Sequence, residues 1–173
     1  MKKADGQAKD SKKKPKNVHK RVVFICTGNT CRSPMAELIL RQKLKEKKIR
    51  WWDVSSCGLQ AEPGTGMSLY SRFALTEIGI DPGDFKSRQL TDAILKKSTV
   101  VFCMTDSQKR LLEGKAHVFS IKDVTGREVP DPYGQGMEEY RAARDELMRA
   151  CDTIIEDYIT QFQDGEDKMY DDE

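Results

Sequence analysis

Residues 22 to 37 constrain this chain most, because they predict a strand that turns sharply into a helix. The apolar run VVFI ends at Cys26, and a Gly-Asn pair follows in the turn, where both residue types tolerate a positive φ. Ser33 is a natural N-cap for the helix, and Pro34 suits its first turn. Such a turn points backbone N–H groups inward, and the helix adds free N–H groups and the positive end of its dipole. The segment therefore predicts a phosphate-binding loop.

A cysteine and an arginine lie in this loop with five residues between them. Helix N-termini and nearby cations favour the thiolate form of a cysteine, so Cys26 would be a nucleophile at the floor of the loop. Arg32 would close the rim, since its planar guanidinium suits two phosphate oxygens at once. The expected phosphate-binding residues share the loop itself: Thr27, Gly28, Asn29, Thr30, Cys31 and Arg32. On spacing alone the pattern also arises by chance, and most buried cysteines are inert core residues.

Longer stretches of the chain resemble the low-molecular-weight protein phosphatases. Their pattern is a strand, C-x-G-N-x-C-R-S-P, a helix and, further along, an Asp-Pro pair; this chain has CTGNTCRSP and then DPYG at 131 to 134. The stretches SSCGL, SRQLT at 87 to 91 and VVFCMTDSQK at 100 to 109 are also similar to that family, and the resemblance covers about residues 21 to 160. It implies a cysteine-dependent protein phosphatase that forms a phosphocysteine intermediate.

The resemblance also implies roles for three other residues. Asp131 matches the family's general acid, which protonates the leaving group and then activates water; the prolines on both sides of it stiffen the chain. Tyr133 would form a wall of the cleft, unless it is only a loop aromatic that covers the core. Cys31 would form a reversible disulfide with Cys26 and so protect the nucleophile from irreversible oxidation.

Ser33 and Asn29 each leave two interpretations open. The Ser33 hydroxyl would donate a hydrogen bond to the Cys26 thiolate, or it would serve only as the helix cap. The Asn29 amide would hold the shape of the loop, or the residue would only accommodate the turn.

Thr30 bears most directly on the substrate. In the resembling family, tyrosine phosphatases usually have an aliphatic residue such as Ile at this position, and bacterial protein-arginine phosphatases have Thr. A threonine hydroxyl can accept a hydrogen bond from a guanidinium, and its methyl group fills space that a flat phenyl ring would need. Tyr133 points the other way, since the arginine branch often has Phe there. Phosphoarginine is therefore the favoured substrate, and a low-molecular-weight protein-tyrosine phosphatase is the alternative.

Two other classes share the loop. Thioredoxin-coupled arsenate reductases need two further resolving cysteines, whereas Cys103 stands alone in its region of this chain. A non-catalytic phosphate-binding module would not require the thiol of Cys26 or the carboxyl of Asp131. Both classes are therefore less favoured than a phosphatase.

The rest of the chain alternates apolar strands with helices, which predicts an α/β domain: a four-stranded parallel sheet with helices on both faces. The expected strands are 22–26, 52–57, 99–104 and 117–121. The expected helices are 34–48, 68–79, 90–97, 106–113 and 137–162, with long loops at 58–66 and 122–136. The domain spans 21–163, between a disordered Lys-rich tail at 1–20 and a disordered acidic tail at 164–173.

Composition sets the remaining expectations. The 173 residues contain five cysteines without the spacing of a disulfide framework, which indicates reduced thiols and a cytoplasmic location. Two histidines and no CxxC pair argue against a metal site, and no cofactor is expected. No apolar run is long enough to span a membrane. The charged N-terminal region is not followed by an apolar segment, so we do not expect a secretory signal. We expect phosphorylated proteins as partners, no nucleic acid, no membrane, and a monomer.

Overall fold

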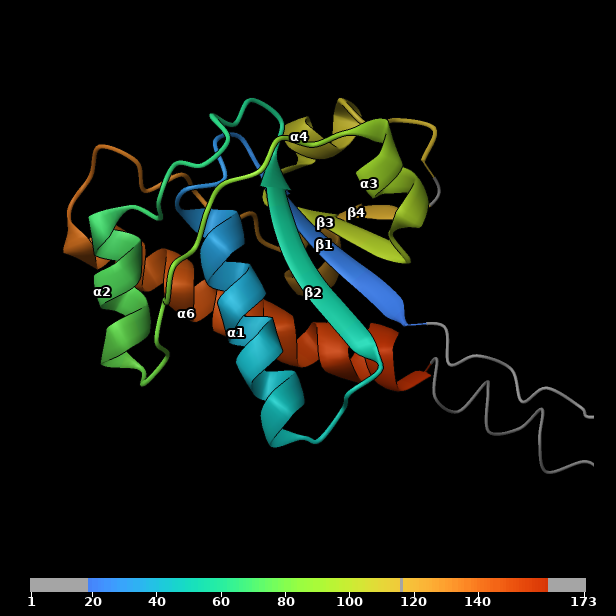
Figure 1. The fold of residues 1–173 in the computed structure, drawn as a ribbon, viewed down its shortest axis with the longest axis horizontal. Coiled ribbons are helices and arrows are strands. Elements are labelled where there is room, and N and C mark those ends of the chain that lie inside the picture. Colours follow the sequence, from blue (N-terminus) through green and yellow to red (C-terminus); the bar gives the residue numbers. More distant parts are fainter. Residues whose placement is uncertain (1–18, 116, 162–173) are drawn as a thin grey trace, which may run out of the picture.

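The chain forms an open parallel sheet with helices on both faces (Figure 1). The computed structural model describes residues 19–115 and 117–161. The strands lie in the order β2-β1-β3-β4, and each neighbouring pair is parallel. Their bounds are β1 Lys20–Cys26, β2 Trp52–Gly58, β3 Val100–Cys103 and β4 Val118–Ser120. The predicted fold class is confirmed.

The helices divide between the two faces of the sheet. Their bounds are α1 Arg32–Glu46, α2 Leu69–Glu77, α3 Asp92–Lys97, α4 Asp106–Arg110, α5 Ile121–Thr125 and α6 Met137–Ile154, which continues into the π-helical turn η1 Ile155–Ile159. Helices α1, α2 and α6 pack against one another on one face, and α3 lies on the other (Figure 1).

Two apolar clusters sandwich the central strand β1, because successive side chains of a strand point to opposite faces. Val22 and Phe24 pack into the large cluster beneath α1 and α6. Val23 and Ile25 pack into a smaller cluster with Leu95 of α3. The carboxyl ends of the strands meet at the top of Figure 1, where residues 27–31 connect β1 to α1.

One helix, α5, begins at the last residue of the predicted strand 117–121 and continues into the segment 122–136 that was predicted as a loop, so both predictions were wrong in part. Ser120 and Asp123 form a reciprocal capping box at its start, and Gly126, with φ 81°, ends it in the left-handed conformation. The sequence carries this signal as Ser-x-x-Asp followed by glycine, but the helix has only five residues and gives no apolar periodicity.

Two other helices end earlier than predicted. The α-helix expected over 106–113 stops at Arg110, and turns lead from there to Gly114, which has a φ of 82°. The α-helix expected over 137–162 changes to π geometry after Ile154, where the Thr160 hydroxyl donates a 2.7 Å hydrogen bond to the Ile155 carbonyl. The predicted inward stripe of the long helix is otherwise buried through Tyr140, Ala143, Leu147, Cys151 and Ile154.

The two predicted tails lie almost wholly outside the described residues. Only His19 and Lys20 of the first tail are described, and Lys20 is the first residue of β1. In the described part of the chain, no helix is both long and apolar enough to cross a membrane.

Candidate active site

The loop between β1 and α1 is fastened through its carbonyl groups. The N–H of Leu59 donates to the Cys26 carbonyl at 3.0 Å, and the N–H of Gln60 donates to the Thr27 carbonyl at 2.9 Å. The Thr30 carbonyl accepts from the N–H of Ser68 at 2.9 Å. Within residues 19–115 and 117–161, no acceptor is found for the N–H groups of residues 28–31. The loop therefore offers consecutive donors to an anion, as a phosphate-binding loop requires.

Cys26 closes β1 at the floor of this loop, and only 3% of the residue is exposed. Its Sγ lies 2.9 Å from the Oγ of Ser33, which is itself fully buried. A thiolate carries no proton, so when Cys26 is ionised the Ser33 hydroxyl is the donor of this bond. The first of the two interpretations of Ser33 is the one that this geometry favours.

The interpretation of Ser33 as the N-cap was wrong. Helix α1 begins at Arg32, its N-cap is Cys31, and no side-chain cap bond is made there. Ser33 lies inside the first turn because its hydroxyl contacts Cys26 and accepts a 2.8 Å hydrogen bond from Asn29 Nδ2.

Asn29 holds the loop in shape. It has a φ of 56°, and its amide nitrogen donates to Ser33 and, at 2.9 Å, to Ser56 Oγ of β2. Its amide oxygen accepts from the N–H of Arg88 at 2.9 Å. Gly28, which was expected to provide the same conformation, does not lie in the left-handed region, so Asn29 alone turns the loop that way.

Gly58, at the end of β2, was missed in the sequence. It pairs with Cys26 in the sheet, and a Cβ there would lie 2.6 Å from the carbonyl oxygen of Thr27 and 3.1 Å from the backbone nitrogen of Asn29. Any side chain would push the loop away from β2. The only signal of this in the sequence is that Gly58 ends the strand that pairs with β1, the strand that precedes the loop.

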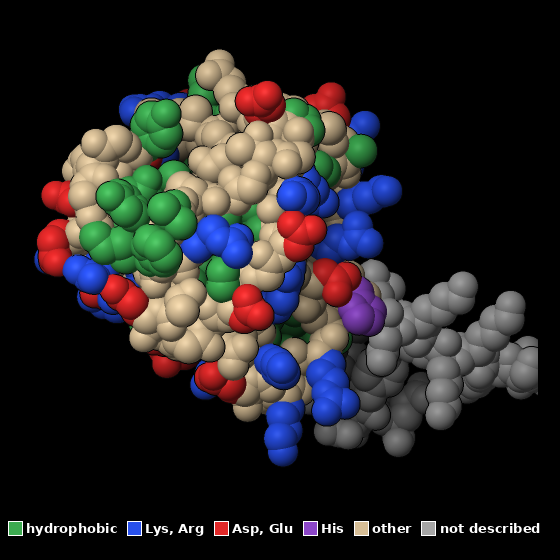
Figure 2. Space-filling view, turned by 60° about the vertical axis from the view of Figure 1, so that its left-hand side comes forward, with side chains coloured by type: hydrophobic (Ala, Val, Ile, Leu, Met, Phe, Trp, Pro, Cys, Tyr) green, Lys and Arg blue, Asp and Glu red, His purple; other side chains and the backbone are tan. Residues whose placement is uncertain are grey.

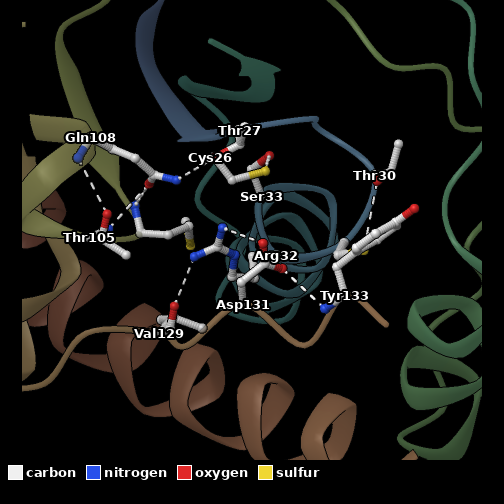
Figure 3. A network of polar contacts seen from close by, with 12 residues as sticks. Cys26, Thr27, Thr30, Arg32, Ser33, Thr105, Gln108, Val129, Asp131 and Tyr133 are labelled. Carbon is white, nitrogen blue, oxygen red and sulfur yellow. Dashed lines mark hydrogen bonds and ion pairs between the residues drawn. The ribbon is translucent and has the colours of Figure 1, made fainter. Parts of the chain in front are cut away.

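Arg32 is buried, and its guanidinium is fixed by two groups from one distant segment (Figure 3). Nη1 donates to the Val129 carbonyl at 3.0 Å, and Nη2 lies 3.5 Å from Oδ2 of Asp131. The other carboxylate oxygen of Asp131 accepts from the N–H of Tyr133 at 3.1 Å. The predicted residues Cys26, Arg32 and Asp131 thus meet at one site.

Asp131 and Tyr133 both face solvent at the mouth of this site. The Asp131 side chain is 55% exposed, and Tyr133 is 76% exposed. Tyr133 therefore does not cover the core, and it stands beside the loop as a cleft wall would (Figure 3).

Gln108 is a second residue that sequence reasoning missed. Its Oε1 accepts from the N–H groups of Met104 and Thr105 at 3.0 and 3.2 Å, and its Nε2 donates to Thr27 Oγ1 at 3.2 Å (Figure 3). It therefore ties the first residue after the nucleophile to the end of β3. Thr105-x-x-Gln108 is a capping-box pattern, but nothing in the sequence shows what else the glutamine contacts.

The thiol of Cys31 is surrounded by hydroxyl groups. Its Sγ donates to Ser68 Oγ at 3.4 Å, and lies 3.5 Å from Tyr140 Oη and 3.7 Å from Thr30 Oγ1. Burial, aided by the bond with Cys31, raises the pKa of Tyr140 to about 12. All five cysteines are free thiols, so the disulfide between Cys26 and Cys31 stays a prediction.

Glu37 of α1 is a buried carboxyl behind the loop. Burial raises its pKa, against the opposing effects of Arg41, Arg88 and a hydrogen bond with Ser56. Arg88 also donates from Nε to the Ser56 carbonyl at 3.2 Å. In the described ranges, no group of three or more His, Cys, Asp or Glu side chains is arranged to hold a metal ion.

Comparisons with known proteins agree with this geometry. The family model described as low molecular weight phosphotyrosine protein phosphatase matches residues 21–164. The protein-arginine-phosphatase of Geobacillus stearothermophilus is 36% identical over 149 residues, which cover 82% of this chain and 97% of that protein. The solved structure of YwlE arginine phosphatase from the same organism superposes with a TM-score of 0.74, covering 84% of this chain and 96% of that one at 36% identity. A low molecular weight protein tyrosine phosphatase from T. tengcongensis superposes with a TM-score of 0.75 at 39% identity, covering 79% of this chain and 98% of that one.

The matched region contains all of the sheet except Lys20, the loop after β1 and the segment of Asp131, so the family match covers the residues of the site. The chain belongs to the low molecular weight phosphotyrosine protein phosphatase family.

Proposed function

We propose that this protein is a cysteine-dependent protein phosphatase with a phosphocysteine intermediate, and that phosphoarginine is its favoured substrate. The observation that carries the chemistry is the meeting of Cys26, Arg32 and Asp131 over a loop whose N–H groups at 28–31 have no acceptor in the described protein. Binding alone would need the donors but not a thiol held by Ser33.

In the first step, the Cys26 thiolate attacks phosphorus and the bond from phosphorus to the leaving group breaks. Arg32 and the loop N–H groups stabilise the charge on the three equatorial oxygens. Asp131, exposed at the mouth and 3.5 Å from Arg32, gives its proton to the leaving nitrogen or oxygen.

In the second step, Asp131 takes a proton from water while the water oxygen attacks phosphorus. The phosphorus–sulfur bond breaks, inorganic phosphate forms, and the Cys26 thiolate returns. Asn29 and Ser33 keep the loop and the thiolate in place throughout.

Thr30 supports phosphoarginine as the substrate. It lies half-buried in the loop, and in the described residues the only side-chain hydrogen-bond partner found for its Oγ1 is the Cys31 thiol, at 3.7 Å. The hydroxyl is therefore available to accept from a guanidinium N–H. One relative of similar sequence identity is named a protein-arginine-phosphatase and another a protein tyrosine phosphatase. Overall sequence identity therefore does not distinguish the two substrates.

A protein-tyrosine phosphatase is the second candidate, and Tyr133 is the observation that favours it. Its ring is 76% exposed beside Asp131 and could stack on a phenyl leaving group.

The test is a comparison of kcat/KM on matched phosphoarginine and phosphotyrosine peptides. Wild type should prefer phosphoarginine, and Thr30→Ile should reverse the preference. A site that forms a hydrogen bond with its substrate discriminates against substrates that cannot form that bond. Thr30→Ser keeps the hydroxyl and should keep the preference. Hydrolysis of para-nitrophenyl phosphate checks that the Cys26 chemistry survives in each variant. A wild type that already prefers phosphotyrosine would establish the second candidate.

The proposal includes a cytoplasmic location and a monomeric state. The five free thiols support a reducing compartment. Fractionation of cells and sedimentation of the purified protein test the two points.

A further inference from the structure

Helix α2 presents an unusual number of exposed apolar side chains. Among the described residues, six large hydrophobic side chains are exposed, and three of them are Leu69, Tyr70 and Phe73 of α2, at 60, 41 and 49%. We call these three residues the α2 face. Figure 2, which turns the α2 side of the molecule forward, shows hydrophobic side chains gathered on that side. Exposed apolar groups that gather in this way mark interaction surfaces more often than single exposed residues do.

The α2 face is held rigidly. Its inward side buries Ser71, Ala74 and Leu75, so the helix cannot roll to hide the outward residues. At its end, Arg144 donates to the Ala74 carbonyl at 3.0 Å and to Glu77 at 2.6 Å.

The α2 face is also continuous with the phosphate-binding loop. Ser68, the N-cap of α2, donates its N–H to the Thr30 carbonyl and accepts from Cys31 Sγ. Leu69 is the next residue along the chain. The first turn of α2 therefore lies beside the loop, whose mouth also carries Asp131 and the exposed Tyr133.

We propose that the α2 face docks the apolar side chains that flank the phosphorylated residue of a substrate protein. A protein whose phosphate enters the loop must lay its neighbouring residues over this rim. An extended segment advances about 3.3 Å per residue, so the residues that flank the phosphorylated one run outward from the loop over its rim. Burial of leucine and phenylalanine side chains against them supplies affinity that a small phosphate ester does not obtain. The inference rests on the Cys26 chemistry proposed above.

The test uses two phosphopeptides with the same phosphorylated residue, one with leucine and phenylalanine around it and one with serine and glutamine. In the double variant Leu69→Ser, Phe73→Ser, kcat/KM on the apolar peptide should fall about tenfold. On the polar peptide and on para-nitrophenyl phosphate it should stay within about twofold of wild type. Trp51→Ser is the matched control: Trp51 is 36% exposed and precedes β2, so it lies at the amino ends of the strands, whereas the loop lies at their carboxyl ends. It should change none of the three rates.

Peptide binding to the Cys26→Ser variant separates the docking surface from the chemistry. Tighter binding of the apolar peptide that is lost in the Leu69→Ser, Phe73→Ser background supports docking, whether or not wild type hydrolyses the peptides. If wild type hydrolyses neither peptide, that result contradicts the proposed function and not the docking proposal. Equal affinity for the two peptides, or an equal loss with Trp51→Ser, overturns the docking proposal. So does sedimentation that shows a wild-type dimer which Phe73→Ser dissociates, because the α2 face would then join two copies of this chain.

Discussion

The Oγ of Ser33 lies 2.9 Å from the Sγ of Cys26 and 2.8 Å from the Nδ2 of Asn29. One buried hydroxyl therefore joins the nucleophile to the residue that gives the loop its shape. Asn29 in turn reaches Ser56 of β2 and the backbone of Arg88, so the position of the thiol depends on segments far along the chain.

Removing this hydroxyl should weaken the nucleophile without unfolding the protein. We expect Ser33→Ala to lower kcat on para-nitrophenyl phosphate at least about tenfold, since a hydrogen bond to a charged group contributes roughly 1.5–3 kcal/mol. Alkylation of Cys26 by iodoacetamide at fixed pH should slow in parallel, because the thiolate is the reacting form. Ser33→Thr keeps a hydroxyl and serves as the control. Unchanged alkylation with a lower kcat would mean that Ser33 acts elsewhere in the cycle.

Asp131 should matter most for leaving groups that hold their protons tightly. Asp131→Asn should slow hydrolysis by ~10²–10⁴, the usual contribution of a positioned acid. Its neighbouring prolines fix the loop, and the amide keeps a similar shape, so the fold should persist. Rates on a series of substituted phenyl phosphates provide the measurement. A uniform loss across the series would indicate structural damage and remove Asp131 from proton transfer.

Gly58 should be intolerant of even a methyl group. In Gly58→Ala the new Cβ would lie 2.6 Å from the Thr27 carbonyl oxygen, so the loop must shift, and overpacking of this kind costs about 1–3 kcal/mol. Both the melting temperature and the affinity for inorganic phosphate should fall. Gly66→Ala is the matched control, because a Cβ at Gly66 meets nothing within 4 Å. Intact phosphate binding in Gly58→Ala would show that the loop does not depend on this close approach.

The catalytic loop could be predicted because its parts are adjacent in the chain. Cys26, Arg32 and the donors between them follow from the strand-to-helix pattern, and the resemblance to a family added Asp131. The contacts of Gln108 with Thr27 and of Gly58 with Asn29 could not be read from the sequence. Gln108 is 81 positions from Thr27 in the sequence, and Gly58 is about 30 positions from Asn29. Both contacts depend on the order of the strands in the sheet.

The errors of prediction have two physical causes: tertiary contacts compete with local preferences, and a very short helix needs only local capping signals. Ser33 is a residue type that commonly caps helices, yet its hydroxyl forms hydrogen bonds with the buried Cys26 thiol and the buried Asn29 amide instead. Helix α5 has no apolar period, yet its capping box and left-handed Gly126 suffice for five residues.

Mild peroxide should inactivate the enzyme reversibly through a disulfide between Cys26 and Cys31. Cys31 must first leave Ser68 and Tyr140, which its Sγ contacts at 3.4 and 3.5 Å. Burial raises the pKa of Cys57 and of Cys103 to about 12, so these two thiols should stay reduced near neutral pH. Mass spectrometry of the treated protein checks this, and a thiol reductant should restore activity. Cys31→Ser should become irreversibly inactive, whereas a Cys26 sulfinate in wild type would refute protection.

The buried carboxyl of Glu37 should make stability fall as the pH rises above the ordinary glutamate value. Burial raises its pKa from 4.5, so between the unfolded and folded values the native state binds more protons than the unfolded state does. The free energy of unfolding contributed by this group is therefore fully present below pH 4.5 and is lost as the pH rises through the folded value. Glu37→Gln removes the titration, so its stability relative to wild type should increase from pH 4 to pH 7 in denaturant titrations. Glu46→Gln, on the exposed side of the same helix, is the control for the loss of a carboxyl group from α1. A relative stability that decreases with pH would mean that Arg41 and Arg88 stabilise the carboxylate by more than burial costs it.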